Sequence, residues 1–418
     1  MKVLHISTAD LRHGAGIAAY RLHCGLRKKG IESKMIVAEK TSNDDDVVSL
    51  DANSKSTTTS IFRFFKNITE LTLNTFWIQN KFSFFSNSLF SHPLIKEASI
   101  IHCHNLHWPF KNFPLKTIEL GKSKPLVWTF HDMWPLTGHC YHSFNCNKWK
   151  SGCGKGCQLS TFIPLAWNSS HKQWLFKKSF YDKNPFQIIT PSQWLANIAK
   201  ETPLLKNHFV HHIPNIIDAD LFTPSNKKEL RNLYGFSEKD KIIFFSAGNI
   251  NVPLKGLNLL LDILKNITFN SNIKLILAGN GHIPIRYNKN IRIRHFGKIK
   301  NAKKMCELYN LADITVVPSK AETFGNVVAE SMACETPVVA FKVGGIPDII
   351  DHKINGYLSE PEDKQSFLEG IEYFLFNDNI RFLAGKRARE KILQFFCEEK
   401  ITSQHILLYK DMIKKRQE

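Results

Sequence analysis

Residues 314–341 read ITVVPSKAETFGNVVAESMACETPVVAF, and this stretch decides the fold class. The apolar runs at 314–317 and 337–341 have the length and the β-branched content of buried strands. Between them, residues 326–334 have the pattern of a helix that begins directly after Gly325. Because a buried strand, a helix and a second buried strand form the repeating unit of parallel α/β sheets, the stretch predicts such a sheet.

The same alternation extends outward from this stretch to both ends of the chain. Strand-like runs alternate with stretches of helical period, and the runs fall at 2–7, 34–38, 98–103, 126–130, 187–190, 209–213, 241–247, 274–278, 291–296, 313–317 and 336–341. The polar residues 218–228 separate the runs into two series and are the best candidate for a linker. We therefore expect two doubly wound α/β domains, at 1–220 and 221–397, followed by a helix at 398–418.

Length and composition exclude several classes of protein. The chain has 418 residues, enough for two or three domains, and its 43% hydrophobic and 22% charged residues are typical of a folded globular protein. No apolar run reaches the roughly 18 residues that a membrane span needs, so we expect a cytoplasmic protein that begins directly with its fold.

The charge balance favours polyanionic partners, because 56 basic and 37 acidic residues give a net charge of +19. No helix-turn-helix, RNA-recognition motif or zinc-finger histidine spacing accompanies this charge, so we expect no nucleic acid as a partner. An anionic membrane surface is a better candidate, since the segment 60–90 combines many aromatic residues with Lys and Arg, as interfacial helices do. Lys172, Lys177, Lys178 and Lys183 form a further basic concentration. Scattered solvated charge and an aromatic hairpin packed on its own domain remain the alternatives.

Two glutamates flank the start of the decisive helix. Glu322 precedes it and Glu330 lies just over two turns along it, so the pair can contact two hydroxyl-bearing parts of one elongated ligand. Gly325 and Asn326 open the helix, and the free N–H groups there can bind an anion or a sugar oxygen. This arrangement suits a sugar that is linked to a diphosphate. A solvated helix with surface carboxylates is the alternative.

The stretch 321–350, AETFGNVVAESMACETPVVAFKVGGIPDII, resembles the donor-binding signature of the retaining glycosyltransferases of family 4. The resemblance implies the GT-B fold, in which two doubly wound Rossmann-like domains face a central cleft and the last helix crosses back to the first domain. It implies that Glu322 contacts hydroxyls of the donor sugar beside the backbone amides around Phe324 and Gly325. It also implies that Glu330 holds the ribose and that catalysis requires no metal or other cofactor.

A second match to that family lies at 246–261, SAGNINVPLKGLNLLL, where Lys255 begins a helix beside a glycine. An ammonium and free N–H groups at a helix start can neutralise a diphosphate together, so Lys255 is the expected partner of the leaving group. Family members usually carry an Arg a few residues earlier, whereas Ile250 stands five residues before Lys255 here. Asn249 or Asn251 can fill part of that contact. An ordinary surface lysine is the alternative reading of Lys255.

Two features of the N-terminal half also match the family. Residues 8–30 place Gly14 and Gly16 between a strand and a helix, which resembles the family's glycine-rich loop beside the bound donor and acceptor. His131 follows the run at 126–130 and resembles the family's histidine near the donor sugar. A tight turn without a ligand also requires glycine, and a strand-end histidine can satisfy local carbonyl groups, so both alternatives stay open.

Four cysteines lie within one segment of eighteen residues, and they are Cys140, Cys146, Cys153 and Cys157. Four soft ligands can hold a tetrahedral zinc ion that stabilises a long loop near the acceptor. The spacings of five, six and three intervening residues are looser than those of common zinc modules. Structural zinc and a reduced or disulfide-tied loop are therefore both open.

With the resemblance, the sequence predicts a retaining hexosyltransferase that moves a sugar from a nucleotide-diphosphate sugar to a glycan or lipid-linked acceptor. The setting that it implies is bacterial envelope or exopolysaccharide assembly at the inner face of the cytoplasmic membrane. Lys255, Glu322 and His131 are the expected catalytic residues. The alternatives are a sugar-nucleotide epimerase or hydrolase of the same fold, and a non-catalytic protein that binds sugar nucleotides or nucleic acid.

Overall fold

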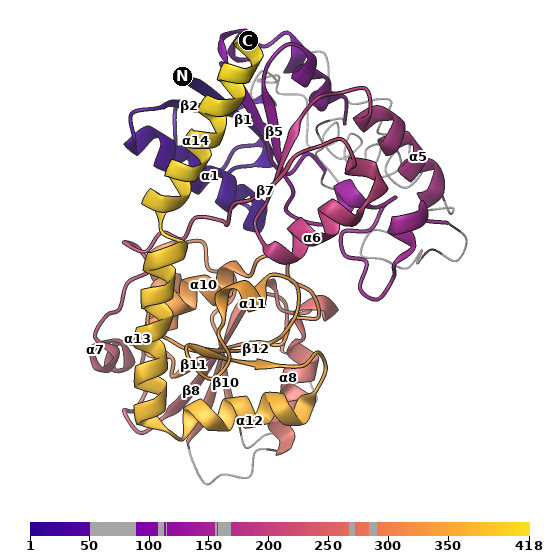
Figure 1. The fold of residues 1–418 in the computed structure, drawn as a ribbon. Coiled ribbons are helices and arrows are strands. Elements are labelled where there is room, and N and C mark those ends of the chain that lie inside the picture. The colour runs from indigo at the N-terminus through magenta and orange to yellow at the C-terminus, as the bar shows by residue number, and fades with distance from the viewer. Residues whose placement is uncertain are drawn as a thin grey trace, which may run out of the picture. The chain divides into compact units, whose positions relative to one another are not determined.

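The computed structural model describes the chain at residues 1–50, 89–107, 113, 115–154, 157, 169–266, 272–283 and 291–418. The chain forms two compact units, one comprising Met1–Pro214 with Thr402–Glu418 and the other Asn215–Ile401 (Figure 1). In the described part of the chain, no helix has both the length and the apolar character needed to span a membrane. The aromatic-rich segment 60–90 falls almost wholly outside the described residues, and its membrane contact stays a prediction.

The first unit is built on a parallel sheet. Among the described residues its strand order is β3-β2-β1-β4-β5-β6-β7, and every neighbouring pair is parallel. The strands are β1 (Lys2–Ala9), β2 (Glu32–Glu39), β3 (Val47–Ser49), β4 (Ile100–Cys103), β5 (Leu126–Thr129), β6 (Gln187–Thr190) and β7 (Val210–His212). Because β2 and β4 flank β1, the strand order reverses at β1, and ligands of open α/β sheets bind at such a reversal.

Helices and 3₁₀ turns connect these strands. They are α1 (His13–Lys28), α4 (Pro93–Glu97), η2 (Leu115–Lys122), η3 (Trp134–Leu136), η4 (Lys148–Ser151), α5 (Ser170–Tyr181), α6 (Gln193–Glu201) and η5 (Pro203–Leu205). The last helix, α14 (Glu398–Gln417), ends on this unit. Its Tyr409 hydroxyl lies 2.6 Å from His102 Nδ1, and Arg416 donates to the Gly121 carbonyl oxygen at 2.9 Å.

The second unit has its own parallel sheet, with the order β10-β9-β8-β11-β12-β13 among the described residues. The strands are β8 (Lys241–Asn249), β9 (Ile273–Asn280), β10 (Arg292–His295), β11 (Ile314–Val317), β12 (Val338–Phe341) and β13 (Gly356–Ser359). The order reverses between β8 and β11. The carboxyl ends of β8, β11 and β12 therefore lie side by side at the edge where such sheets bind ligands.

Helices cover both faces of this second sheet. They and the 3₁₀ turns are α7 (Lys227–Leu233), η6 (Pro253–Lys255), α8 (Leu257–Ile263), η7 (Leu264–Asn266), α9 (Ala302–Leu311), α10 (Asn326–Ala333), α11 (Ile346–Ile349), α12 (Lys364–Leu375) and α13 (Asp378–Phe395). On β8, Phe244 packs in the core with Tyr309 of α9, whereas the next residue, Phe245, packs in the opposite core with Leu260 of α8. A strand buried on both faces needs apolar residues at every position, which explains the continuous apolar runs in the sequence.

The structure confirms two doubly wound α/β sheets and the predicted series of buried strands, with ends that differ by a few residues. The sequence prediction missed β3 and β13, which form one edge of each sheet. These strands are three and four residues long, too short to give a strand-like apolar run.

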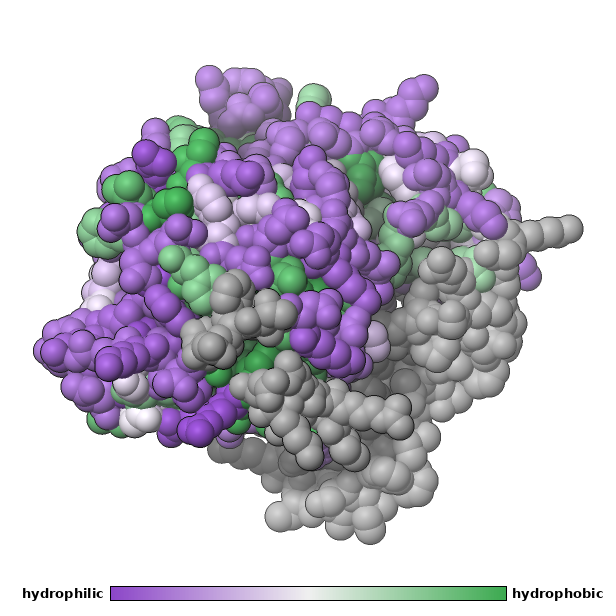
Figure 2. All heavy atoms as spheres, turned by 90° about the horizontal axis from the view of Figure 1, so that it is seen from below, coloured by the Kyte–Doolittle hydropathy of each residue, from purple (hydrophilic) through white to green (hydrophobic). Residues whose placement is uncertain are grey.

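The exposed charges are dispersed. Hydrophilic residues cover most of the coloured surface in Figure 2, with hydrophobic residues scattered among them. Lys172, Lys178 and Lys183 are exposed. The assignment of Lys177 to the same basic surface is wrong, because its side chain is fully buried. Lys177 lies three residues after Trp174 on the inward face of α5, so the helical period carries it into the core.

Candidate functional site

A candidate site lies at the carboxyl ends of β11 and β12 in the second unit. Glu322 belongs to the loop between β11 and α10, and its carbonyl oxygen accepts a 3.1 Å hydrogen bond from the backbone N–H of Gly345, which follows β12. The preceding residue, Gly344, has a φ of 53°, and a Cβ there would lie 1.6 Å from the same carbonyl oxygen. Only glycine allows this approach, and the contact fixes the backbone of Glu322.

Lys255 reaches the same place from the loop after β8. Its Nζ lies 2.5 Å from Glu322 Oε1, and that oxygen also accepts a 2.9 Å hydrogen bond from Ser319 Oγ. The side chains of Lys255 and Glu322 are 32% and 18% exposed, so the pair borders solvent. The structure thus brings together two residues that lie 67 positions apart in the chain.

Two backbone contacts hold the Lys255 loop against the Glu322 loop. Lys320 N–H donates to the Leu254 carbonyl oxygen at 2.8 Å. Gly256 precedes α8 with a φ of 77°, and a Cβ there would lie 2.0 Å from the Pro318 carbonyl oxygen. The backbone therefore places the ammonium of Lys255, independently of its ion pair.

The start of α10 lies directly after Glu322. Gly325 precedes the helix with a φ of 104°, and Asn326 is its first residue. Asn326 Oδ1 accepts a 3.3 Å hydrogen bond from Asn215 Nδ2. The ring of Phe324 is buried against Phe396, so only the backbone of Phe324 can contact a ligand. The first N–H groups of α10 supply a partial positive charge next to the Lys255–Glu322 pair.

Glu330 lies further along α10 and is partly buried. Its Oε2 accepts a 3.1 Å hydrogen bond from the hydroxyl of Tyr309, whose side chain is fully buried on α9. The carboxylate is therefore held in a defined position. Sequence reasoning missed Tyr309 and Ser319, although Ser319 stands only three residues before Glu322.

Asn249 and Asn251 were the expected substitutes for the family's second basic contact. The Asn251 amide instead holds the loop after β9, since its Oδ1 accepts from His282 N–H at 2.7 Å and its Nδ2 donates to the His282 carbonyl oxygen at 2.8 Å. Asn249 Oδ1 accepts from Asn251 N–H at 2.9 Å. The amide of Asn251 is thus engaged in loop structure, which argues against a ligand role for it.

In the first unit, Gly14 and Gly16 lie within the first turn of α1, which begins at His13. The expectation that both glycines precede the helix is therefore wrong by about one turn. A Cβ on Gly16 would lie 2.8 Å from the Ala9 carbonyl oxygen. Close packing of α1 against the end of β1 is enough to require glycine at position 16.

His131 stands two residues after β5, at the carboxyl edge of the first sheet. Burial lowers its pKa to about 4, the charge of Asp132 acts in the opposite direction, and His107 adds to the lowering. The imidazole is therefore neutral at physiological pH. Its Nε2 lies 3.4 Å from His104 Nδ1, which connects it to a group of buried histidines.

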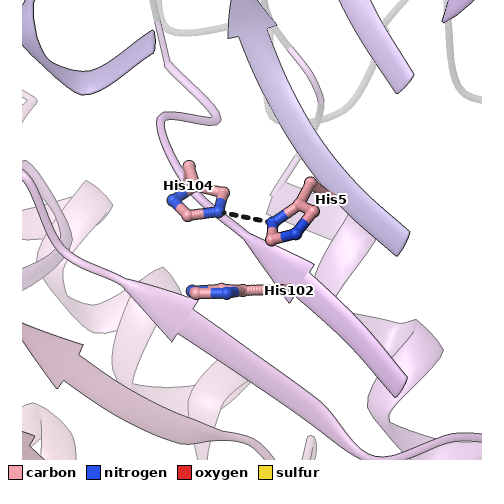
Figure 3. A group of neighbouring side chains, drawn as sticks. All are labelled: His5, His102 and His104. Carbon is pink, nitrogen blue, oxygen red and sulfur yellow. Dashed lines mark hydrogen bonds between the residues drawn. The ribbon is translucent and has the colours of Figure 1, made fainter. Parts of the chain in front are cut away.

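Figure 3 shows that group, which consists of His5 on β1, His102 on β4 and His104 just after β4. Their ligand atoms all lie within 4.8 Å of one another. Burial lowers the pKa of all three well below the usual histidine value. His5 Nδ1 lies 3.0 Å from His104 Nε2, while the two nitrogens of His102 lie 2.6 Å and 2.7 Å from the hydroxyls of Tyr409 and Thr129. The group is a network of neutral, hydrogen-bonded imidazoles that sequence reasoning missed.

The four clustered cysteines all belong to the first unit and occur as free thiols. Cys140 is buried, and Cys146, Cys153 and Cys157 are partly buried. Among the described residues, the histidine ligand atoms are gathered within 4.8 Å, whereas the cysteine sulfurs are not.

Comparison with known proteins identifies the family. Residues 12–221 match the model described as Glycosyltransferase Family 4, and residues 226–391 match the model described as Glycosyl transferases group 1. The N-acetyl-alpha-D-glucosaminyl L-malate synthase of Bacillus anthracis is 30% identical over 215 residues, which cover 50% of this chain and 55% of the relative. The lipopolysaccharide 1,2-N-acetylglucosaminetransferase of Salmonella typhimurium is 30% identical over 237 residues, covering 52% and 60%. The matched region thus spans a little over half the length of each relative.

Among solved structures, the sucrose-phosphate synthase of Thermosynechococcus elongatus has the same fold. The superposition has a TM-score of 0.69 at 18% identity and covers 99% of this chain and 100% of that one. The family models together cover most of the chain, and the first of them alone matches half of it. This protein therefore belongs to Glycosyltransferase Family 4 and has the GT-B fold.

Proposed function

We propose that this protein is a retaining glycosyltransferase that moves a sugar from a nucleotide-diphosphate sugar to a glycan or lipid-linked acceptor. The observation that carries the proposal is the contact between Lys255 and Glu322 beside the start of α10. It puts a cation and an acceptor of sugar hydroxyl groups next to each other. A nucleotide sugar has the matching arrangement, an anionic diphosphate joined directly to a hydroxyl-rich ring.

In the proposed reaction, the bond between the anomeric carbon and the diphosphate oxygen breaks, and the electron pair stays on the diphosphate. Lys255 and the first N–H groups of α10 stabilise this charge, which is greatest in the transition state. The acceptor hydroxyl forms the new bond to the anomeric carbon on the same face, and its proton passes to the departing diphosphate oxygen. Glu322 and Glu330 hold the sugar and the ribose, and neither acts as a nucleophile.

His131 contributes as a neutral imidazole in this proposal. A pKa of about 4 leaves one ring nitrogen with a proton and the other without, so the ring can orient a sugar hydroxyl without adding positive charge. We assign no cofactor to the reaction itself. The four clustered cysteines have a structural role, for which zinc is the candidate ligand.

Two observations support an acceptor in bacterial envelope or exopolysaccharide assembly, at the inner face of the cytoplasmic membrane. The net charge of +19 favours anionic surfaces and lipid-linked diphosphates. One relative is named for transfer of N-acetylglucosamine to lipopolysaccharide, and another for transfer of the same sugar to malate. N-Acetylhexosamine donors are therefore the first to be tested.

The experiment has two steps. A thermal-shift panel of UDP, GDP and ADP sugars identifies the donor, since a ligand at about a hundred times its Kd stabilises the fold by about 2.7 kcal/mol. Nucleotide release is then measured with and without lipid-linked and glycan acceptors. Release that depends on acceptor, with the anomeric configuration of the product retained by NMR, supports the proposal. Release without acceptor identifies a hydrolase or epimerase, and binding without release under any condition identifies a binding protein.

A further inference from the structure

The four cysteines of the first unit lie in the segment that follows His131 and leads to α5. Burial raises the pKa of Cys140 to about 12, and the neighbouring thiols of Cys157, Cys153 and Cys146 raise it further, with a hydrogen bond to Cys157. Cys140 is thus hydrogen-bonded to one of the other three cysteines and within electrostatic range of the rest. Their separate positions in the sequence converge on one place in the fold.

The backbone around these cysteines is suited to thiolates. Gly138 N–H donates to Cys153 Sγ at 3.2 Å. Cys146 and Cys157 each close a tight turn, with their N–H groups donating to the carbonyl oxygens of Ser143 at 2.8 Å and Gly154 at 3.2 Å. An N–H directed at a sulfur favours its anionic form, which is the form that binds metals.

Lys177 lies beside the same cysteines, fully buried. Its Nζ donates to the carbonyl oxygens of Trp134 at 2.5 Å and Thr137 at 2.9 Å, and it lies 3.6 Å from the centre of the Trp134 ring. Burial lowers the pKa of Lys177 to about 7, while the nearby groups of Cys153, Asp132 and Cys140 act in the opposite direction. A buried ammonium is costly unless an opposite charge lies close to it.

The nearest carboxylate has other partners. Asp132 lies 3.0 Å and 3.1 Å from His107 Nε2 through its two oxygens, and Oδ1 also accepts from Trp134 N–H at 2.8 Å. All the hydrogen bonds that Lys177 makes in the structure go to neutral carbonyl groups. Negative charge on the adjacent sulfurs would satisfy the lysine.

We propose that Cys140, Cys146, Cys153 and Cys157 bind one structural zinc ion and that Lys177 balances part of the charge of the resulting site. Four thiolates and Zn²⁺ carry a net charge of −2, and the ammonium reduces this to −1. The thiol protons are released to water on binding, and no redox step is involved. Since the sulfurs are not gathered within 4.8 Å, binding draws them closer together.

The buried histidines are a poorer metal site, although their ligand atoms are closer together. The nitrogens of His102 already contact two hydroxyls, and His5 and His104 contact each other. A dication among neutral, fully buried imidazoles would also lack a compensating anion. The zinc site of the cysteines has a structural consequence beyond the proposed reaction, because it fixes the loop that runs from His131 to α5.

The test uses full-length protein purified without a histidine tag. We expect about one zinc per chain by elemental analysis, and zinc-edge X-ray absorption with four sulfur neighbours at about 2.3 Å. This measurement on the unmodified protein needs no variant that folds. A nitrogen-rich shell would place the metal at the histidines and overturn the proposal. Protein without zinc, with its four cysteines alkylated as thiols or joined in disulfides, would overturn it as well.

Variants locate the metal. Cys140→Ser and Cys153→Ser should lose the zinc, whereas Cys24→Ser, outside the cluster, and His104→Gln should keep it. Full zinc content in either cluster variant would contradict the assignment. Lys177→Met should weaken zinc binding about tenfold or more in competition with a chelator, as loss of a supporting partner does. The exposed neighbour provides the control, and Lys178→Met should leave the affinity unchanged.

Discussion

Replacement of Lys255 by alanine tests the central assignment. The ammonium lies 2.5 Å from Glu322 Oε1, where it can reach a departing diphosphate. Removal of one preorganised donor to a transition-state charge lowers kcat by about 10²- to 10³-fold, equivalent to about 2.7–4 kcal/mol. We expect an effect of that size from Lys255→Ala, with partial recovery in Lys255→Arg, which restores the charge in a different shape.

The effect of the same substitution on stability should be small. The Lys255–Glu322 pair borders solvent, with side chains 32% and 18% exposed, and ion pairs of this kind contribute about 1 kcal/mol or less. For a unit of this size, that corresponds to a Tm shift of about 2–4 °C. Lys255 therefore separates from a purely structural residue, because its kinetic loss should exceed its stability loss by at least about 2 kcal/mol.

The assay is steady-state release of nucleotide from the donor that the thermal-shift panel selects. Lys320→Ala is the matched control, since Lys320 belongs to the loop beside the site and pairs with the exposed Glu362. A kcat of Lys255→Ala within about threefold of the wild-type value would refute the reasoning, because one donor to the leaving group is worth far more. An equal loss in Lys320→Ala would show that general loop damage, and not the ammonium, is responsible.

Three further predictions follow from the geometry. Glu330→Gln should weaken binding of the nucleoside diphosphate about tenfold or more in calorimetry, and by more than Glu322→Gln does, because only Glu330 is assigned to the ribose; the reverse order would exchange the two roles. The folded-state pKa of His131 is about 4, below its unfolded value of about 6.5. Between these values the unfolded chain binds more protons, so stability should fall as the pH drops from about 6.5 to 4, and a His131→Gln variant should show a shallower fall in Tm. Gly344→Ala should abolish donor binding, since its Cβ would lie 1.6 Å from the Glu322 carbonyl oxygen, whereas Gly235→Ala, at a φ of 70° but with nothing within 4 Å, should leave donor binding intact.

The candidate site could be predicted in part because much of it is local. The helix that carries Glu330 and the loop that carries Glu322 both come from one stretch between two apolar runs, and the structure has this strand, loop, helix and strand in that order. The roles of these glutamates remain proposals. Tyr309 could not be predicted as the partner of Glu330, because it lies on a different helix and reaches the carboxylate only after both helices pack on the sheet.

The buried polar groups of the first unit give the opposite case. His5 and His102 face each other because β4 pairs with β1 in a particular register, although 97 positions separate the two strands' partners. Strand order and register depend on contacts between distant segments, which the period of a single segment does not encode. The burial of Lys177 is a further example, since the sequence places it among lysines that are all exposed in the structure.

The sequence by itself determined the alternation of strands and helices, the two α/β units and the family to which the chain belongs, because these follow from local hydrophobic period and from short motifs. Only the tertiary structure decided that Lys255 meets Glu322, that buried histidines form a hydrogen-bonded network and that Lys177 lies beside the cysteines. Each of these contacts joins residues from different elements, and side chains meet across elements only when the sheet order and the packing of helices have been fixed.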